Sequence, residues 1–277
     1  MFEMMFYPFL ALICVALMSG AYGCQMVWHK VACLGDALSH GALLGLAFGV
    51  LLGIDENVAL FVLSGVWAFF LWFLTKGRQN SLDTIMAFLM QASMALAIIL
   101  FALSGANGDD SMLHAFLGDV LMITAKDVAY IALLDIVLAF VLVLCWKKWV
   151  LMAISMDLAR AQKYSTGWLQ FVFFTAIGFF IAVTMKLMGA LLAPAFFVIP
   201  ALIARPLSKT PEKMALLATV FACVASVAGL VISYYFDLPT GASVVCVCLC
   251  LYVVVVFCGF IKSLLIKKRA YYNQALK

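Results

Sequence analysis

Residues 168–204 read WLQFVFFTAIGFFIAVTMKLMGALLAPAFFVIPALIA, an apolar stretch of 37 residues whose only charged side chain is Lys186. A helix that crosses a membrane needs about 20 apolar residues, so this stretch is too long for one crossing. Lys186 and Gly189 interrupt it, which predicts either two helices or one helix followed by a broken segment. Irregular backbone at membrane depth is tolerated only where protein or a water-filled cavity covers it.

The composition of the whole chain places it in a membrane. Hydrophobic residues make up 68% of the 277 residues and charged residues 11%, whereas soluble domains carry about 25% charged residues. A soluble protein could not cover so much apolar surface with so few polar groups. The composition therefore excludes soluble enzymes, nucleic-acid-binding proteins and disordered chains, and predicts one all-α integral membrane domain over residues 1–277.

Further apolar runs lie on both sides of the long stretch. The chain forms nine membrane-spanning helices if residues 168–204 cross twice, and eight if the broken segment does not cross fully. Residues 147–166 form the longest predicted cytoplasmic segment and contain a predicted interfacial helix. The other predicted spans lie near residues 6–27, 37–53, 57–75, 82–104, 128–146, 214–236 and 243–266.

The basic residues predict the orientation of this helical bundle. Cytoplasmic loops of membrane proteins are enriched in Lys and Arg. With nine helices, 15 of the 17 Lys and Arg residues fall on one side, and only Lys126 and Lys186 lie outside the basic clusters. This pattern places the N-terminus outside and the C-terminus inside, and it explains the basic patches without nucleic-acid binding.

Asp36 and His40 are four residues apart, so a helix places them on one face. A carboxylate and an imidazole one turn apart can bind one divalent transition metal ion. If the helix begins near Lys30, His40 lies about 15 Å along it, close to the middle of a core about 30 Å thick. Charges at that depth are costly and usually functional. The spacing leaves two alternatives open, a metal site or an Asp–His hydrogen bond that locks helix packing.

Three further carboxylates are secondary candidates for a metal path. Asp83 follows Ser81 and could instead cap a helix N-terminus. Asp119 lies near the predicted outer face, where a solvated carboxylate needs no special role. Asp135 lies inside a predicted helix without a visible partner, so it is either part of a site or simply protonated. Lys186 could reach the membrane interface by snorkelling.

Residues 200–213 predict a short, stiff, basic element at the inner face. Two prolines interrupt the helical backbone there, and the following Thr-Pro-Glu is typical of a helix start, with a cap, a first-turn proline and an acid. The alternatives are an ordinary loop and a docking element for a protein partner. The residues that would form the docking element are Pro200, Arg205, Pro206, Lys209, Thr210, Pro211 and Glu212.

The chain lacks the motifs of an enzyme that would power or catalyse a reaction. It contains no G-x-x-x-x-G-K-[ST] phosphate loop and no H-E-x-x-H pair. Uphill transport by this chain would therefore draw on another chain or on an ion gradient. We expect no ATPase activity of its own and no permanently bound cofactor.

Six motifs occur in an order that resembles a known family. They are Gly35-Asp36 with Ser39–Gly45, Phe116–Asp119, Met185–Leu192, Ile199–Ala201, Thr210–Met214 and Asp237–Ser243. Together they resemble, over nearly the whole chain, the metal-type permease family of bacterial ABC importers with a type II fold, and most closely the zinc-uptake permease. One departure is Gln91, which stands where some zinc permeases have His.

This resemblance implies a homodimer in the inner membrane, with two cytoplasmic ATP-binding subunits and a periplasmic metal-binding protein as partners. It implies ATP-driven alternating access for zinc, with manganese or iron as alternative substrates. Asp36 and His40 would touch the ion in transit, and residues 200–213 would couple the permease to the ATPase. A less favoured alternative is a secondary transporter, in which Asp36, Asp83 and Asp135 would serve ion coupling.

Overall fold

The computed structural model describes residues 2–76, 82–105, 112, 115–118, 120 and 123–275. Within these ranges the regular elements are all helices, and eight of them are long and apolar enough to cross a membrane. The predicted all-α membrane fold is confirmed. The eight helices are α1 (Phe2–Trp28), α2 (Cys33–Leu52), α3 (Glu56–Lys76), α4 (Leu82–Leu103), α6 (Ala125–Ile154), α8 (Thr166–Met188), α10 (Pro211–Phe236) and α11 (Thr240–Ala275).

The long apolar stretch forms α8 and a short helix, α9 (Ala193–Ala204), which leads into the 3-10 turn η2 (Arg205–Leu207). The 12 residues of α9 make a helix about 18 Å long, which is too short for a core about 30 Å thick. Of the two predicted alternatives, one helix followed by a broken segment is therefore correct. The break lies inside the protein, because Ser39 Oγ donates a hydrogen bond of 2.7 Å to the carbonyl of Ala190.

Residues 115–118 cover the turn between α8 and α9. The N–H of Ala190 donates to the carbonyl of Ala115 at 2.9 Å. Gly118 and Gly189 have φ angles of +70° and +81°, and a Cβ on either glycine would overlap the backbone of the other segment. Glycine is needed at both positions because it alone combines that conformation with so close an approach.

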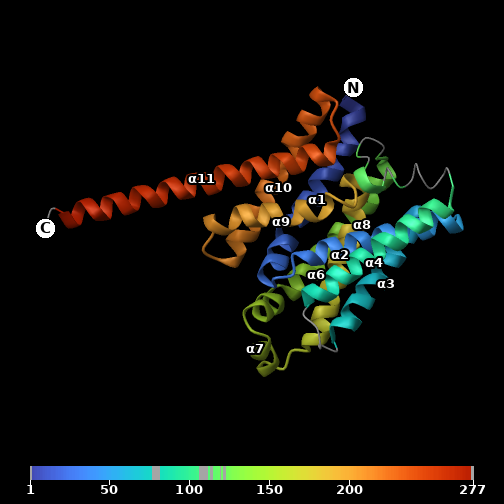
Figure 1. The fold of residues 1–277 in the computed structure, drawn as a ribbon, viewed down its shortest axis with the longest axis horizontal. Helices are drawn as coiled ribbons and strands as arrows, with labels where there is room; N and C mark the ends of the chain where they lie inside the picture. Colours follow the sequence, from blue (N-terminus) through green and yellow to red (C-terminus); the bar gives the residue numbers. More distant parts are fainter. Residues whose placement is uncertain are drawn as a thin grey trace.

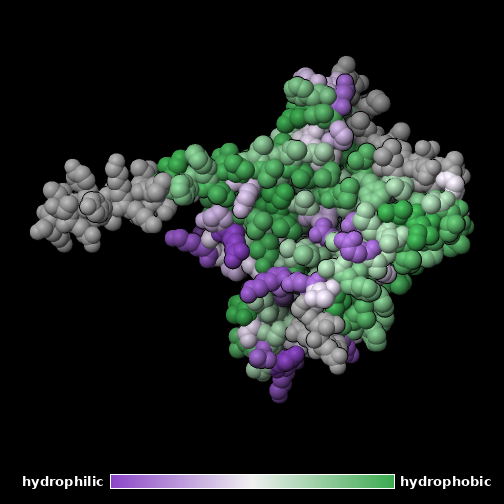
Figure 2. All heavy atoms as spheres, viewed as in Figure 1, coloured by the Kyte–Doolittle hydropathy of each residue, from purple (hydrophilic) through white to green (hydrophobic). Residues whose placement is uncertain are grey.

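Helices α2 and α8 form the most buried part of the molecule. α2 packs against α3, α4, α8 and α9, whereas α1 packs against α6, α9 and α10. In Figure 1, α11 extends away from the other helices, and α2, α3 and α4 lie together on the opposite side. Figure 2 shows a largely hydrophobic surface, with hydrophilic residues gathered around α7 (Met156–Ala161) and the turn between α9 and α10.

α6 is longer than the sequence predicts. The predicted span ends at residue 146, but α6 continues to Ile154, and α7 is the short helix that follows it. The Trp149 side chain is fully buried, and its indole N–H donates to the carbonyl of Leu169 at 3.1 Å. Met152 is buried as well. One face of α6 therefore stays apolar past the two lysines of residues 147–148, because residues three or four apart share a face.

The turns between the helices gather at two ends of the bundle. Met5 lines a cavity with the turn between α10 and α11, residues 237–239, so the N-terminus lies at that end. Trp28 packs near Met214 at the start of α10, which places the α1–α2 and α9–α10 turns at the opposite end. We call these the N-terminal end and the α7 end. The start of α11 lies at the N-terminal end, and α11 carries the C-terminus out to the side of the bundle (Figure 1).

Candidate metal-transit site

Asp36 and His40 share one face of α2, as their spacing predicts. Asp36 lies half-buried in the first turn, and His40 is 8% exposed. His40 is seven residues from Cys33, the first residue of α2, which is about 11 Å along the helix. It lies nearer the helix start than predicted, because α2 begins at Cys33 and not near Lys30.

The His40 ring leaves one nitrogen available. Its Nδ1 atom is buried and has no hydrogen-bond partner among the described residues. Buried side-chain nitrogens without a partner are uncommon in folded proteins and call for an explanation. An Asp36–His40 hydrogen bond through Nδ1 is therefore not present in this structure, whereas an imidazole lone pair with no other partner suits a transition metal ion.

Helix α3 approaches another face of α2 very closely. A Cβ on Gly41 would overlap the ring of Trp67, whose indole N–H donates to the carbonyl of Ala37 at 3.1 Å. A Cβ on Gly45 would lie 2.8 Å from the Cβ of Leu63. Small residues four apart allow helices in membranes to pack backbone to backbone. The glycines Gly41, Gly45 and Gly49 therefore form the surface of α2 that contacts α3.

This packing decides where the candidate ligands point. Successive helical residues are about 100° apart around the axis, so His40 and Asp36 lie roughly 100–140° around α2 from Gly41. Gly35 contacts Pro194 of α9 on a further face. The Asp36–His40 face is therefore distinct from the faces that α3 and α9 cover closely, while α4, which packs along α2 more extensively than any other helix, covers part of the remaining surface.

The structure does not bring the other predicted acids to this pair. Asp83 is exposed in the first turn of α4. Asp135 is buried on α6, which packs against α1, α7 and α8, and not among the main neighbours of α2. Asp119 lies outside the described residues. Gln91, the departure from the family pattern, is exposed on α4.

One chain thus supplies two donors at this site. In the described ranges, no group of three or more His, Cys, Asp and Glu side chains could hold a metal ion. Structural zinc sites are closed by four protein ligands. A two-donor site on one chain is consistent with an ion that is held briefly and then released.

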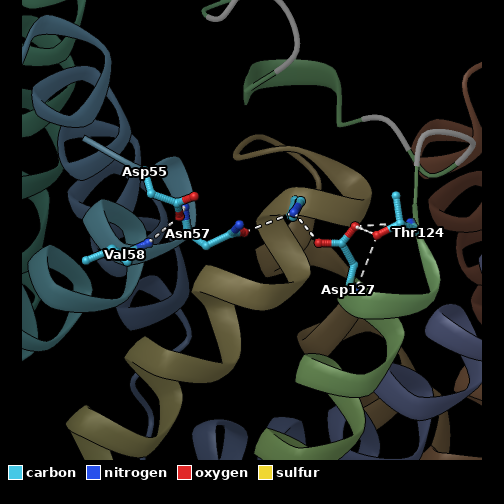
Figure 3. A network of polar contacts seen from close by, with 6 residues as sticks. Asp55, Asn57, Val58, Thr124 and Asp127 are labelled. Carbon is cyan, nitrogen blue, oxygen red and sulfur yellow. Dashed lines mark hydrogen bonds and ion pairs between the residues drawn. The ribbon is translucent and has the colours of Figure 1, made fainter. Parts of the chain in front are cut away.

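The structure contains a polar network at the N-terminal end of the bundle that the sequence did not predict. Lys186 Nζ lies 2.6 Å from Asp127 Oδ1 and 2.9 Å from Asn57 Oδ1. Figure 3 shows Asn57 and Asp127 reaching toward each other from different helices. Lys186 of α8 therefore joins α3 to α6. The sequence predicts only that Lys186 reaches the interface, and it does not show which partners lie there.

Both partners of Lys186 are fixed by helix caps. Thr124 and Asp127 form a capping box at the start of α6, in which the Thr124 N–H donates to Asp127 Oδ2 at 3.0 Å. Asp55 Oδ1 accepts from the N–H groups of Asn57 and Val58 at 3.0 and 3.2 Å at the start of α3. These caps are visible in Figure 3. The Thr-x-x-Asp pattern at residues 124–127 is the signal that could have located this helix start.

The turn between α9 and α10 is exposed at the α7 end. Thr210 Oγ1 accepts from the N–H of Lys213 at 3.3 Å, and Pro211 is the first residue of α10, so the predicted helix start is confirmed. Pro200 is buried within α9 and does not belong to the exposed surface. The exposed residues of the turn are Arg205, Pro206, Leu207, Lys209, Thr210 and Glu212.

Comparison with known proteins places this arrangement in a family. The "High-affinity zinc uptake system membrane protein ZnuB" of Haemophilus influenzae is 31% identical over 245 residues, which cover 88% of this chain and 94% of that protein. The "Manganese transport system membrane protein MntC" of Listeria monocytogenes is 25% identical over 235 residues, 85% of this chain and 83% of that protein.

A solved structure has the same fold. "PsaBC from Streptococcus pneumoniae in complex with Fab" superposes with a TM-score of 0.81 at 24% identity, covering 92% of this chain and 91% of that one. The model of the "ABC 3 transport family" matches residues 1–259. This match covers nearly the whole chain and agrees with the resemblance carried by the six sequence motifs. The chain therefore belongs to the ABC 3 transport family.

Proposed function

We propose that this chain is the membrane permease subunit of an ATP-binding cassette importer that carries a divalent transition metal ion, zinc first among them. The observation that carries the proposal is the buried, unpartnered Nδ1 of His40, one helical turn from Asp36. Imidazole and carboxylate are preferred zinc ligands. The names of the relatives support a metal substrate, with manganese or iron as the alternatives.

The α7 end is the cytoplasmic end in this proposal. Lys126 and Lys186 are the basic residues at the N-terminal end, and the others with described side chains belong to the α7 end. Since Lys and Arg are enriched in cytoplasmic loops, the N-terminus is periplasmic and the C-terminus cytoplasmic. The basic residues at the α7 end are Lys30, Lys76, Lys147, Lys148, Arg160, Lys163, Arg205, Lys209 and Lys213.

Two copies of the chain complete the metal site. One copy supplies Asp36 and His40, and a twofold axis beside this face of α2 brings the same two residues from the partner. Four such donors match the tetrahedral coordination that zinc prefers. When the two halves move apart during alternating access, the set of four is divided and the ion is released.

Two cytoplasmic ATP-binding subunits drive this movement. The exposed turn at residues 205–212 is the surface that docks on them, because it is stiffened by two prolines and by the Thr210 cap. A periplasmic metal-binding protein delivers the ion at the N-terminal end. Residues 200–213 as a whole form the coupling element, with buried Pro200 joining the exposed turn to α9.

Uptake into liposomes tests this function. The chain is reconstituted with its ATP-binding subunit, and uptake of radiolabelled zinc and manganese is followed with internal ATP or with a proton gradient alone. We expect ATP-dependent uptake, with zinc saturating at the lower concentration. Gradient-driven uptake by the isolated chain without ATP would establish a secondary transporter instead.

A further inference from the structure

Asp135 is a buried carboxyl group without a hydrogen-bond partner in the part of the chain that the structure describes. It lies ten residues into α6, which is about 15 Å along the helix, and its side chain is 7% exposed. Neither Oδ1 nor Oδ2 has a hydrogen-bond partner among the described residues. A charged carboxylate at this depth, with no hydrogen bond and no countercharge, is strongly disfavoured, and the neutral acid is the form that the site accommodates.

Among the described residues, no cation lies close enough to balance a charge on Asp135. Lys186 is bound to Asp127, which is eight residues earlier on α6 and therefore about 12 Å away along the helix. Lys147 is twelve residues later, about 18 Å away. The titratable groups that interact electrostatically with Asp135 are Cys14 and Tyr22 of α1. Neither a thiol nor a phenol can carry a positive charge, so neither balances a charge on Asp135.

α1 and α6 run side by side in the same direction. The Tyr22 hydroxyl donates to the carbonyl of Leu138 at 2.9 Å, and the rings of Trp28 and Trp146 are 5.8 Å apart. We call the line of contact between these helices the α1–α6 seam. Asp135 lies on this line, one helical turn before Leu138.

The same seam contains further buried polar atoms without partners. Gln25 of α1 is fully buried, and neither its Oε1 nor its Nε2 has a hydrogen-bond partner among the described residues. His29, one turn later and just past the end of α1, has a buried Nε2 without a partner among the described residues. By helical position, Gln25 lies between Tyr22 and Trp28, which both contact α6. Unpaired polar groups thus continue from Asp135 toward the α7 end.

The seam ends at a small cavity. His29 lines this cavity together with Trp149 of α6 and Gln170 of α8, and its volume is about 40 Å³. A polar cavity needs about 10–15 Å³ to hold one water molecule. The cavity at His29 is therefore large enough for buried water, and its lining supplies polar groups that water can bind.

From this arrangement we propose that Asp135 is a proton-binding site, separate from the metal site, which exchanges its proton with the α7 end along a hydrated α1–α6 seam. The carboxyl O–H bond breaks, its electron pair stays on the carboxylate, and the proton passes through water beside Gln25 and His29. A conformation that hydrates Asp135 releases the proton, so protonation favours the conformation described here. That the α7 end is cytoplasmic rests on the proposed function. The proton site at Asp135 and the α1–α6 seam do not depend on it.

Infrared spectroscopy of the purified full-length chain tests the proton site. We expect the carbonyl-stretch band of a protonated carboxylic acid at about pH 7, and we expect Asp135→Asn to remove the Asp135 component of that band. Asp157→Asn is the matched control, because Asp157 is an exposed acid on α7. An acid band that is unchanged in Asp135→Asn overturns the proposal.

Isotope exchange tests the seam independently of transport. On transfer to heavy water, the Asp135 band shifts as its proton is replaced by deuterium. We expect Gln25→Leu to slow this shift about tenfold or more, and Met18→Leu, an apolar exchange on the same helix, to leave it unchanged. If Gln25→Leu does not fold, the rate of the isotope shift is measured in His29→Phe instead. Exchange at the wild-type rate in both seam variants would refute the route.

Discussion

Among single side chains, the candidate metal ligand His40 gives the clearest prediction for transport. Replacing His40 with Ala removes an imidazole that no described residue binds through Nδ1. Removal of a metal ligand should lower zinc uptake by more than about tenfold, since even the loss of a residue that only hydrogen-bonds to a metal ligand costs about that much. Because His40 Nδ1 makes no packing hydrogen bond, assembly with the ATP-binding subunit should persist. Uptake by the reconstituted variant, compared with Asp157→Asn, is the measurement, and wild-type uptake would remove His40 from the path.

The Lys186 network predicts a stability effect. Lys186→Met removes the cation that pairs with Asp127 and leaves only the Thr124 cap on this carboxylate, whose side chain is 15% exposed. Such a loss should lower the free energy of unfolding by about 1–3 kcal/mol, toward the lower limit because the Lys186 side chain is 37% exposed and partly screened by solvent.

Thermal unfolding in detergent measures this effect. Lys126→Met is the matched control, because Lys126 is exposed and adjacent to Asp127. The double variant Lys186→Met with Asp127→Asn should be less destabilised than the sum of the single variants. Additive effects would show that the ion pair does not contribute to stability.

His29 predicts a dependence of stability on pH. Burial lowers its pKa from 6.5 to about 4, against a smaller raising effect from a hydrogen bond to the Trp149 backbone. The unfolded chain therefore binds more protons than the folded one between about pH 6.5 and 4. The stabilisation from neutral His29 is fully present above this window and is lost as the pH falls through it. Thermal unfolding in detergent should show this loss, and His29→Gln should reduce it; equal slopes would contradict the assignment.

Among the helices, the contact between α2 and α3 depends on glycine. Gly41→Ala would place a methyl group where the Trp67 ring lies. Overpacking of this kind typically costs about 1–3 kcal/mol, and here it also disturbs the Trp67–Ala37 hydrogen bond. Gly167→Ala is the control, since a Cβ at Gly167 meets nothing within 4 Å. Thermal stability that is equal in the two variants would show that α3 can move away without cost.

The turn between α9 and α10 predicts a defect in assembly. Leu207 is an apolar residue that is 51% exposed at the tip of this turn. Leu207→Asp should weaken copurification of the ATP-binding subunit and ATP-dependent uptake, because it places a charge in the proposed docking surface. Arg160→Glu on α7 is the control at the same end of the molecule. Unchanged copurification, with folding intact in both variants, would place the docking surface elsewhere.

For the molecule as a whole, the helices were largely predictable because their apolar runs are long and bounded by polar residues. Thr210 and Pro211 also predict the start of α10, since cap preferences are local. The sequence predicts the end of α6 too early because the two lysines of residues 147–148 make the following segment look polar. One face of that segment is nevertheless apolar and packs against α8. Local sequence patterns do not predict a contact when the two residues that form it lie far apart in the chain.

The candidate site shows this limit directly. The spacing of Asp36 and His40 predicts a shared face, which is a local property of a helix. Only the packing of the helices shows that His40 Nδ1 has no partner among the described residues and that Asp135 lies apart on the α1–α6 seam. Lys186 lies 59 residues from Asp127 and 129 from Asn57, so no sequence pattern connects them.

X-ray absorption at the zinc edge tests the central claim, that Asp36 and His40 hold the ion in passing, most directly. The complete transporter is loaded with zinc and arrested by an ATP analogue that is not hydrolysed. We expect four nitrogen and oxygen ligands at about 2.0–2.1 Å, including two imidazoles that disappear in His40→Gln. An unchanged imidazole signal in His40→Gln would contradict the account.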